Sequence, residues 1–386
     1  MNVAATACVC RELRLRQFRN FPDLTLTFPP AGVAVIGDNG AGKTNLLEAL
    51  YYLGIFRSFR GAPDEQLVRF GGEAFHLRGL FEIPSTGATR EITAAYEVKT
   101  RRKRVTVDGA EPERIGDAIG QIAAVIFSPS DLALVAGPPA ERRRFLDIVL
   151  SLAARGYLEA LQRYRQVLRH RNALLKRGAT PAMLGPWDDA LVEWGSRIIA
   201  QRAAWVAAHA DTFARRYREI GTTVSARLAY GAGISADCDL TEEAGVAEVF
   251  AAQLARIAGR ERDRAMTLAG PHRDDVMLLV EGPDGPVDLR EYGSGGQMRT
   301  AAIALRMIEA ETLRTAKGRP PMILLDDVFA ELDAGRSRRL LDMLDAEERG
   351  QVILTAPKES DVELRQSGGF ISSLEPWRIT SGRVKA

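Results

Sequence analysis

Residue types that could bind a nucleotide stand in two separate segments of this 386-residue chain. The first segment, GDNGAGKT, matches the pattern G-x-x-x-x-G-K-[ST] of loops that cradle phosphate groups. The second is MILLDD (Met322–Asp327), an apolar run that ends in two carboxylates and is typical of a strand that holds a magnesium ion. A single nucleotide-binding unit needs far less sequence than lies between them, so we expect a large insertion.

In the first segment, glycines let backbone N–H groups approach phosphates closely, and the following helix directs its positive end at them. We expect the Lys43 amine to reach the β- and γ-phosphates and the Thr44 hydroxyl to bind Mg²⁺. Contacts to ATP are expected from the whole loop and the residue after it: Gly37, Asp38, Asn39, Gly40, Ala41, Gly42, Lys43, Thr44 and Asn45.

Asp326 and Asp327 complete the predicted ATP site. Successive side chains on a strand point to opposite faces, so the two carboxylates are expected to differ in role. We expect Asp326 to hold Mg²⁺, directly or through water, and Asp327 to orient or deprotonate the attacking water. Lys43 and Asp327 are therefore the candidate catalytic residues.

A third segment, YGSGGQMRT (Tyr292–Thr300), opens a further helix with glycines. It could be a second anion site or a plain helix N-cap, and the sequence leaves both interpretations open. The segment resembles the signature motif of ABC-type ATPases, and Glu331–Asp333 follows at the spacing of that class's D-loop. The resemblance implies a head-to-tail homodimer in which these residues of one subunit contact ATP held by the other: Ser294, Gly296, Gln297 and Asp333.

The elements around these motifs read as an α/β protein. Alternating apolar residues in 11–28 predict two strands that meet at Asn20, and Gly32–Ile36 predicts a short strand leading into the glycine-rich loop. Asn45–Leu53 has the spacing of a helix. Strand, loop and helix form the context that the phosphate-binding pattern requires.

Composition changes near Ser130, where an Ala-, Leu- and Arg-rich helical region begins. Tyr157–Arg177 and Trp187–Ile220 predict two long helices, broken at Gly178–Pro186, that form an antiparallel hairpin. Together with the resemblance to ABC-type ATPases, these elements lead us to expect an α/β, ABC-type P-loop ATPase head, with a mixed sheet and helices, that carries an inserted helical lobe. The expected division is residues 1–129 and 265–386 for the ATPase core and 130–264 for the lobe.

Bulk composition agrees with a globular protein, because 46% of residues are hydrophobic and 26% are charged. The net charge of +2 does not by itself indicate nucleic acid, so any basic surface must be local. No apolar stretch is long enough to span a bilayer, and the first residues lack a secretory pattern. Three cysteines form neither a disulfide framework nor a CxxC pair, which favours a reducing, cytoplasmic location.

The chain resembles the bacterial RecF family of DNA repair proteins over nearly its whole length. The resemblance rests on FRNF before the loop, GKTNLLEALYYL, FSPSDLALVAGPPAERRRFLD, GPHRDD and LLDDVFAELD, in this order. It implies an ATP-dependent clamp of recombinational repair and replication restart that binds gapped or junction DNA. It also implies RecR, RecO and RecA as partners, and a nucleoid-associated protein.

Several positions depart from the expected patterns. Phe59 stands where the family commonly has His, and Gly293 replaces the Leu that opens the ABC signature. Asp327 stands where transporters have Glu, and Ala356 stands where they have a His that senses the γ-phosphate. The last two departures favour slow hydrolysis, in which ATP acts as a switch. We expect a weak, DNA-stimulated ATPase.

Local basic clusters are the candidate DNA contacts. One group opens the inserted lobe and another decorates the first long helix: Arg142, Arg143, Arg144, Arg163, Arg169 and Lys176. Solvated helix faces or an inter-lobe role are the competing interpretations. The segment His272–Asp275 could likewise be a structural ion-pair cluster or could couple nucleotide to the lobes.

Three other functions remain as alternatives. The ATP-hydrolysing subunit of an ABC transporter is disfavoured by the helical insertion, by Asp327 and by Ala356. A structural ATPase of the SMC type needs sustained heptads that this insertion is too short to hold. An ATP-binding DNA scaffold that does not hydrolyse ATP differs from the expected clamp only in its chemistry.

Overall fold

The computed structural model describes residues 7–221, 224–235, 237–282, 285–346, 349–359 and 369–385. The chain forms two compact units. The first unit combines Met1–Asp131 with Glu309–Ala386, and the second unit is Leu132–Ile308. Within the described residues, no helix combines the length and apolar character that a membrane crossing requires.

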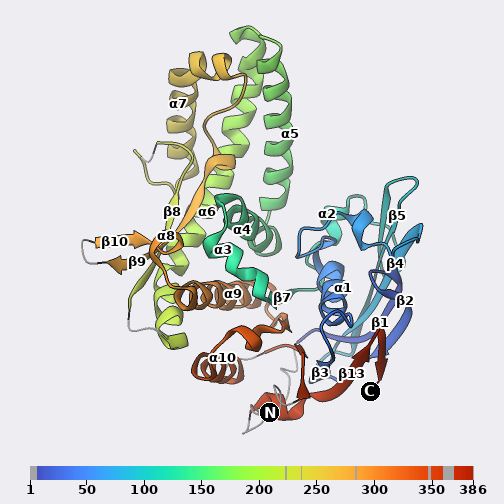
Figure 1. Ribbon diagram of the computed structural model, residues 1–386. Coiled ribbons are helices and arrows are strands. Elements are labelled where there is room, and N and C mark those ends of the chain that lie inside the picture. The colour runs from blue at the N-terminus through green and yellow to red at the C-terminus, as the bar shows by residue number, and fades with distance from the viewer. Residues whose placement is uncertain are drawn as a thin grey trace. The chain divides into compact units, whose positions relative to one another are not determined.

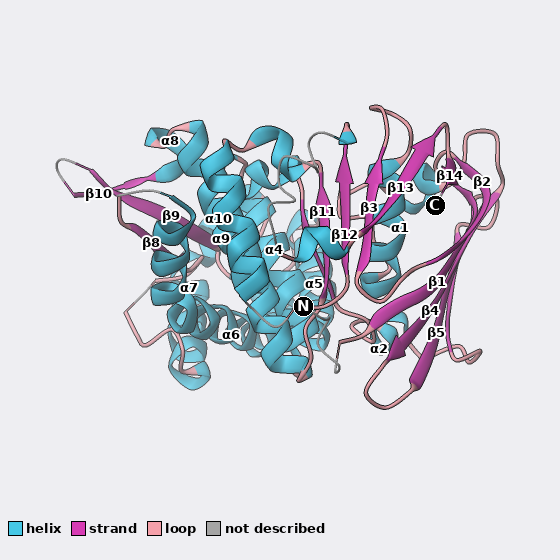
Figure 2. Ribbon diagram, turned by 90° about the horizontal axis from the view of Figure 1, so that it is seen from below, coloured by secondary structure: helices cyan, strands magenta, loops and turns pink. Residues whose placement is uncertain are grey.

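A six-stranded sheet forms the centre of the first unit, in the order β14-β13-β3-β12-β11-β7. All neighbours in it are parallel except β13 and β14, which pair antiparallel. Its central strands are continuous apolar runs, as expected for strands covered on both faces. Figure 2 shows β11, β12, β3 and β13 side by side. The strands are β3 (Gly32–Ile36), β7 (Ala124–Phe127), β11 (Met322–Asp326), β12 (Val352–Ala356), β13 (Glu375–Thr380) and β14 (Arg383–Lys385).

A second, antiparallel sheet of the first unit has the order β2-β1-β4-β5-β6. The expected pair of strands meeting at Asn20 is confirmed as β1 and β2, whose register places Phe18 opposite Phe21. Burial alternates along β4 and β5, which gives this sheet one buried face. Its strands are β1 (Val9–Phe18), β2 (Phe21–Thr27), β4 (Ala74–Ile83), β5 (Ala88–Glu97) and β6 (Arg102–Val107).

Helix α1 (Lys43–Ile55) lies between the two sheets of the first unit. It contacts β4 and β5 of the antiparallel sheet and β7, β11 and β12 of the parallel one. A helix covered on both sides should be apolar all round, and every residue from Leu46 to Ile55 is buried. The remaining helical segments of this unit are η1 (Asp64–Leu67), α2 (Ile115–Ala118), η4 (Val328–Glu331), α10 (Ala334–Ala346) and η5 (Phe370–Ser373).

Helices dominate the second unit, as expected from its composition. The predicted hairpin is present as α5 (Tyr157–Lys176) and α6 (Pro181–Gly221), with α7 (Glu243–Arg264) against α6 (Figure 1). Helix α6 begins six residues earlier than expected. Pro181 suits a first helical turn because its ring fixes φ, and the helix continues through Pro186 at the loss of one hydrogen bond.

A three-stranded antiparallel sheet, β10-β9-β8, completes the second unit. It explains why this unit extends to Ile308, whereas the expected lobe ends at residue 264. Strand β9 pairs with both β8 and β10, so the segment that contains β9 and β10 belongs with the helices. Helix α9 (Gly295–Lys317) starts in the second unit and ends in the first. The remaining elements are η2 (Pro129–Leu132), α3 (Ala133–Ala136), α4 (Pro139–Ala153), β8 (Ala226–Gly231), η3 (Pro271–Arg273), β9 (Asp275–Gly282), β10 (Gly285–Asp288) and α8 (Leu289–Tyr292).

Candidate nucleotide-binding site

The phosphate-binding pattern adopts the expected geometry, with β3 leading into the loop and α1 beginning at Lys43. Gly40 has φ of 82° and Gly42 has φ of 116°, both in the left-handed region that favours glycine. A Cβ atom on Gly42 would lie 2.5 Å from Asn20 Nδ2. Glycine is therefore required at 42 both by backbone conformation and by the close approach of Asn20.

Lys43 is a buried cation at the start of α1, with 4% of its surface exposed. Its Nζ donates to the carbonyl of Gly37 at 2.8 Å and to that of Asp38 at 3.3 Å. The same Nζ lies 3.6 Å from Asp327 Oδ2. The amine is thus held directly over the loop, where phosphate groups of a nucleotide would meet it.

Thr44 and Asp326 come together although 282 positions separate them, since the Thr44 hydroxyl donates to Asp326 Oδ1 at 2.9 Å. Parallel pairing of β3 with β12 and of β12 with β11 brings the end of β11 to the loop. Burial raises the pKa of Asp326 to about 6, with a further increase from the neighbouring Asp327 carboxylate. The two halves of the predicted ATP site therefore form one site within the first unit.

Asp327 departs from the expectation that the two carboxylates point to opposite faces of a strand. Strand β11 ends at Asp326, and Asp327 has φ of 44°, so the alternation stops between them. The Thr355 hydroxyl lies 3.1 Å from Asp326 Oδ1 and 3.3 Å from Asp327 Oδ1. Both carboxylates therefore reach the same hydroxyl, and their difference lies in burial and in the contact of Asp327 with Lys43.

The residues at this site fit a magnesium ion bound together with phosphates. Mg²⁺ commonly takes one or two carboxylates, a hydroxyl and phosphate oxygens instead of an all-protein cage. Among the described residues, no group of three or more His, Cys, Asp or Glu side chains could hold a metal by itself. The ion would be held by the Thr44 hydroxyl and the Asp326 carboxylate. Burial disfavours ionisation of this carboxylate, so a bound cation would stabilise its charged form.

The segment from Ser294 lies in the second unit, at the start of α9. Ser294 Oγ accepts from the Gln297 backbone N at 3.2 Å, and Gln297 Oε1 accepts from the Ser294 backbone N at 2.8 Å. This reciprocal pair is a capping box, so Ser294 is the N-cap of α9. Contact with a nucleotide by Ser294, Gly296 and Gln297 remains a prediction.

Asp333 caps helix α10 with its side chain. Its carboxylate accepts from the Arg336 backbone N at 2.9 Å and pairs with the Arg336 guanidinium at 2.7 Å. The backbone hydrogen bond, followed by the Arg336 charge, lowers the pKa of Asp333. Its expected contact with a nucleotide stays a prediction.

Two residues that the sequence did not single out belong to the site. Asn20, in FRNF, donates to the Ala41 carbonyl at 3.0 Å and accepts from Asn45 Nδ2 at 2.8 Å. Thr355 lies beside Asp326 because β12 pairs with β11 in a register that matches these two residues. FRNF, at the turn between β1 and β2, lies two strands before the loop and was a signal for Asn20, whereas Thr355 required the sheet order.

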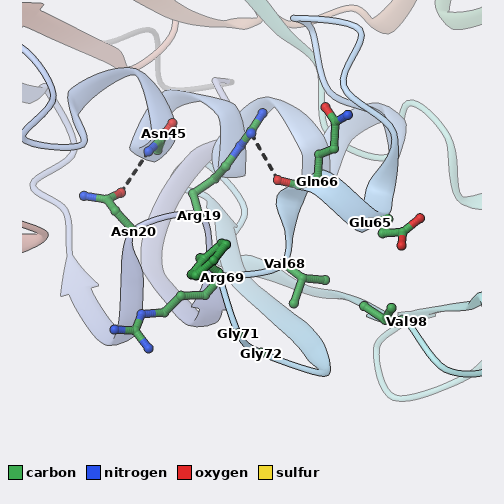
Figure 3. A pocket seen from close by; sticks show the side chains of 11 residues that line it. Arg19, Asn20, Asn45, Glu65, Gln66, Val68, Arg69, Gly71, Gly72 and Val98 are labelled. Atoms are coloured by element: carbon green, nitrogen blue, oxygen red, sulfur yellow. Dashed lines mark hydrogen bonds between the residues drawn. The ribbon is translucent and has the colours of Figure 1, made fainter.

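A hollow of about 830 Å³ in the first unit is lined in part by Asn20, which contacts the phosphate loop, and by Asn45, which follows it (Figure 3). Arg19 fixes one wall, since its backbone N donates to the Leu67 carbonyl and its guanidinium to the Gln66 carbonyl. Phe70, at the rim, is fully exposed. The lining residues are Arg19, Asn20, Asn45, Glu65, Gln66, Val68, Arg69, Phe70, Gly71, Gly72 and Val98.

The candidate DNA contacts differ in exposure. Arg142 is 4% exposed, and its guanidinium donates to both Asp275 oxygens at 2.7 and 2.8 Å. Arg143 is half-buried and donates to the Asp274 carbonyl at 2.7 Å, and Arg144 is half-buried. Arg142 is therefore a structural ion-pair residue that is too buried to contact DNA phosphates.

The candidates on α5 are all exposed: Arg163, Arg169 and Lys176. Arg169 and Lys176 share one face because seven residues make about two helical turns. Arg163 lies on a different face and is 3.9 Å from Glu159. Arg171, also basic and on α5, is buried and paired with Glu261, so it belongs to the core.

The segment from His272 forms a structural network inside the second unit. Asp274 accepts from Arg202 Nη1 at 2.7 Å, and His272 Nδ1 lies 2.7 Å from the Tyr164 hydroxyl. Burial is the main cause that lowers the pKa of His272 to about 4, so this imidazole is neutral at physiological pH. GPHRDD therefore takes part in a structural network, and a role in coupling nucleotide to the lobes stays a prediction.

Parallel sheet, phosphate loop, paired carboxylates and inserted helical unit together define the fold of an ABC-like P-loop ATPase head. The family described as "RecF/RecN/SMC N terminal domain" matches residues 9–368. The chain belongs to the RecF family. It is 37% identical over 366 residues to the DNA replication and repair protein RecF of Salinibacter ruber, covering 92% of this chain and 86% of the relative. It is also 37% identical over 359 residues to the RecF of Symbiobacterium thermophilum, covering 92% of each.

Solved structures agree with this family. The chain superposes with a TM-score of 0.87 on the recombination mediator protein RecF-ATP in the RecFOR pathway, at 30% identity over 98% of both chains. An Smc head bound to the C-winged helix domain of ScpA matches with a TM-score of 0.54 at 15% identity, over 97% of this chain and 96% of that chain. That second likeness shows the fold alone. The expected ATPase head with an inserted lobe is confirmed.

Proposed function

We propose that this protein is an ATP-dependent DNA-binding clamp of recombinational DNA repair and replication restart. The contact between Thr44 and Asp326 carries the ATP part of the proposal, because it joins the loop and the magnesium strand at 2.9 Å. Relatives named DNA replication and repair protein, and a neighbour described as RecF-ATP in the RecFOR pathway, support the DNA part. The same relatives disfavour a transporter subunit.

In this proposal ATP and Mg²⁺ bind at the phosphate loop, and hydrolysis is slow. Mg²⁺ held by Thr44 and Asp326 would neutralise charge on the phosphates. Lys43 orients the phosphates, and Asp327 orients or deprotonates the attacking water. An Asp at 327 and an Ala at 356 favour slow hydrolysis, so ATP acts as a switch.

The hollow beside the loop is the proposed place of the nucleotide base. Lys43 and Thr44 serve the terminal phosphates, so the ribose and base extend past Asn45, which lines the hollow. Phe70 offers an exposed ring for stacking, a contact worth about 1–3 kcal/mol per base. Phe70→Ala should weaken ATP binding about tenfold and leave inorganic triphosphate binding unchanged; equal ATP affinity would place the base elsewhere.

Two molecules would close head to tail around two ATPs. Ser294, Gly296 and Gln297 of one subunit would then face the nucleotide of the other, with Asp333 nearby. Gly295 opens α9 behind a Ser294 cap, which supplies a helix N-terminus suited to phosphate oxygens. The closed dimer would hold gapped or junction DNA against exposed basic residues, including Arg169 and Lys176, and would act with RecR and RecO to load RecA.

Sedimentation with ATP, ADP or no nucleotide tests the switch. Wild type should dimerise with ATP and not with ADP. Lys43→Met should remain monomeric because it lacks the amine over the loop. Ser294→Arg should also remain monomeric while binding ATP with wild-type affinity, since Ser294 is proposed to contact the nucleotide of the other subunit and not its own. Dimerisation of Lys43→Met with ATP would rule out the switch, and loss of ATP binding in Ser294→Arg would rule out the cross-subunit role.

A further inference from the structure

The hairpin of β13 and β14 contacts the phosphate loop, a connection that no motif in the sequence indicates. Strand β13 runs beside β3 in parallel, with Trp377 opposite Val35. The chain then turns at Ser381 and Gly382, with φ of 46° and 76°, before β14 begins. In this turn the Gly382 backbone N donates to the Ala41 carbonyl at 3.0 Å.

The same carbonyl accepts a second hydrogen bond from another distant segment. Asn20 Nδ2 lies 3.0 Å from the Ala41 carbonyl oxygen, and Asn20 Oδ1 is occupied by Asn45 Nδ2. Gly382 and Asn20 also lie against one another, since a Cβ on Gly382 would stand 2.9 Å from the Asn20 carbonyl oxygen. Three parts of the chain therefore meet at one peptide group of the loop.

The direction of this peptide group matters for phosphate binding. In a trans peptide the carbonyl and the following N–H point in opposite directions. Two donors that hold the Ala41 carbonyl on one side therefore turn the Gly42 N–H to the other. Backbone N–H groups of such loops are the phosphate ligands, so the direction of the Gly42 N–H sets part of the binding geometry.

We infer that the turn of the β13–β14 hairpin is a positioning element for nucleotide binding, with Gly382 and Asn20 holding the loop in its phosphate-binding form. The inference rests on the proposed ATP binding and adds a part of the chain far from the known motifs. Gly382 acts only through Ala41 and is a positioning residue. Glycine is required at 382 because φ of 76° and the nearby Asn20 carbonyl both oppose a side chain.

Gly382→Ala tests the inference. The added methyl group forces the turn away from Asn20, which weakens the bond to Ala41. A lost hydrogen bond of about 1.4 kcal/mol corresponds to a tenfold change in affinity, so Kd for ATP should rise about tenfold by calorimetry. Gly87→Ala is the matched control, because Gly87 has φ of 65° in the β4–β5 turn with no atom within 4 Å of its Cβ position. It carries similar backbone strain and should keep the wild-type Kd.

If Gly382 had a merely structural role, Gly382→Ala would lower the melting temperature. It would not change the ATP affinity measured at temperatures well below that melting temperature. Gly382→Ala should instead show a raised Kd at a temperature where wild type and both variants are fully folded. A semisynthetic protein with an ester in place of the Gly382 N–H should show the same raised Kd without added bulk, and it serves as the test if Gly382→Ala does not fold.

A double variant that combines Asn20→Leu with Gly382→Ala provides the second readout, the Kd for ATP compared with those of the two single variants. Leu has a similar shape, carries no charge and cannot donate to Ala41. If both donors hold one carbonyl, the double variant should deviate from the product of the single effects by threefold or more. Wild-type Kd in both the Gly382→Ala and ester proteins, or multiplicative effects in the double variant, would overturn the inference. Absence of ATP binding by wild type would instead contradict the proposed function itself.

Discussion

Asp326 is a buried carboxylate held by hydroxyl groups, with Thr44 and Thr355 at 2.9 and 3.1 Å from Oδ1. Hydroxyl groups stabilise the charge only in part, and burial raises the pKa of Asp326 to about 6. A cation at this position would replace the water that burial removes. The residue therefore carries an electrostatic cost that ion binding relieves.

The pH dependence follows from the direction of this pKa shift. The folded protein binds a proton at Asp326 more tightly than the unfolded chain, in which the carboxyl has its ordinary pKa of 3.8. Asp326 therefore lowers stability as pH rises through 3.8 to 6, and the full cost is present above pH 6. Asp326→Asn should raise the stability of the nucleotide-free protein by on the order of 2 kcal/mol at pH 7.5 and by little near pH 4. Thermal unfolding of both proteins between pH 4 and 7.5, without Mg²⁺, measures this difference in stability.

The affinity for Mg²⁺ should change with pH in the opposite direction to stability, because it should increase as pH rises. Mg²⁺ needs the ionised carboxylate, so below pH 6 its apparent affinity in the ATP complex should fall, approaching tenfold per pH unit. Asp326→Asn should abolish this pH dependence together with most Mg²⁺-dependent ATP affinity. An unchanged melting temperature at pH 7.5, or full Mg²⁺ dependence in Asp326→Asn, would contradict the assignment.

Asp327 is less buried and lies beside Lys43, which suits a proton acceptor at the mouth of the site. Asp327→Asn should slow single-turnover hydrolysis by a factor on the order of 100, the usual lower range for a lost general base. DNA release after an ATP chase should slow in parallel, because the closed dimer persists. Release at the wild-type rate would remove Asp327 from this role.

At the scale of elements, the sequence predicted the strand, loop and helix around Lys43 because glycine spacing and apolar periodicity are local signals. It predicted the α5–α6 hairpin, but placed the start of α6 after Pro186, since proline normally ends helices. Local patterns could not show that Thr355 faces Asp326, because sheet order decides it. The contact of Gly382 with Ala41 was equally hidden, as it depends on where β13 joins the sheet.

Helix α5 separates its basic residues by face. Arg165, Arg169 and Lys176 line one exposed face at helical spacing, and Glu159, the one acidic residue of α5, lies away from this stripe beside Arg163. Arg169→Ala with Lys176→Ala should weaken DNA binding about equally for all sequences and reduce the slope of log K against log salt by about 2, near one for each lost phosphate contact. Fluorescence anisotropy at several salt concentrations measures both quantities.

Arg163→Ala is the matched control for this face. It removes an exposed arginine of the same helix whose charge is already close to a carboxylate, so its salt slope should stay near wild type. If Arg163→Ala lowers the slope and the double variant does not, the other face of α5 contacts DNA.

At the scale of the whole molecule, the two compact units carry different sites of the proposed clamp. The first unit contains the complete phosphate loop and magnesium strand, and the second contains the Ser294 segment and the basic face of α5. In the proposed head-to-tail dimer, closure by ATP therefore joins the first unit of one molecule to the second unit of the other. DNA affinity should then depend on the nucleotide, although the proposed DNA contacts Arg169 and Lys176 belong to the second unit and the phosphate loop belongs to the first.

Equilibrium binding to gapped, single-stranded and duplex DNA, each with ATP, ADP or no nucleotide, tests this most directly. With ATP and Mg²⁺, binding to gapped DNA should be at least tenfold tighter than with ADP or no nucleotide, and Lys43→Met should remove the difference. Equal affinity in all three nucleotide states, with ATP shown to be bound, would contradict the ATP-dependent clamp.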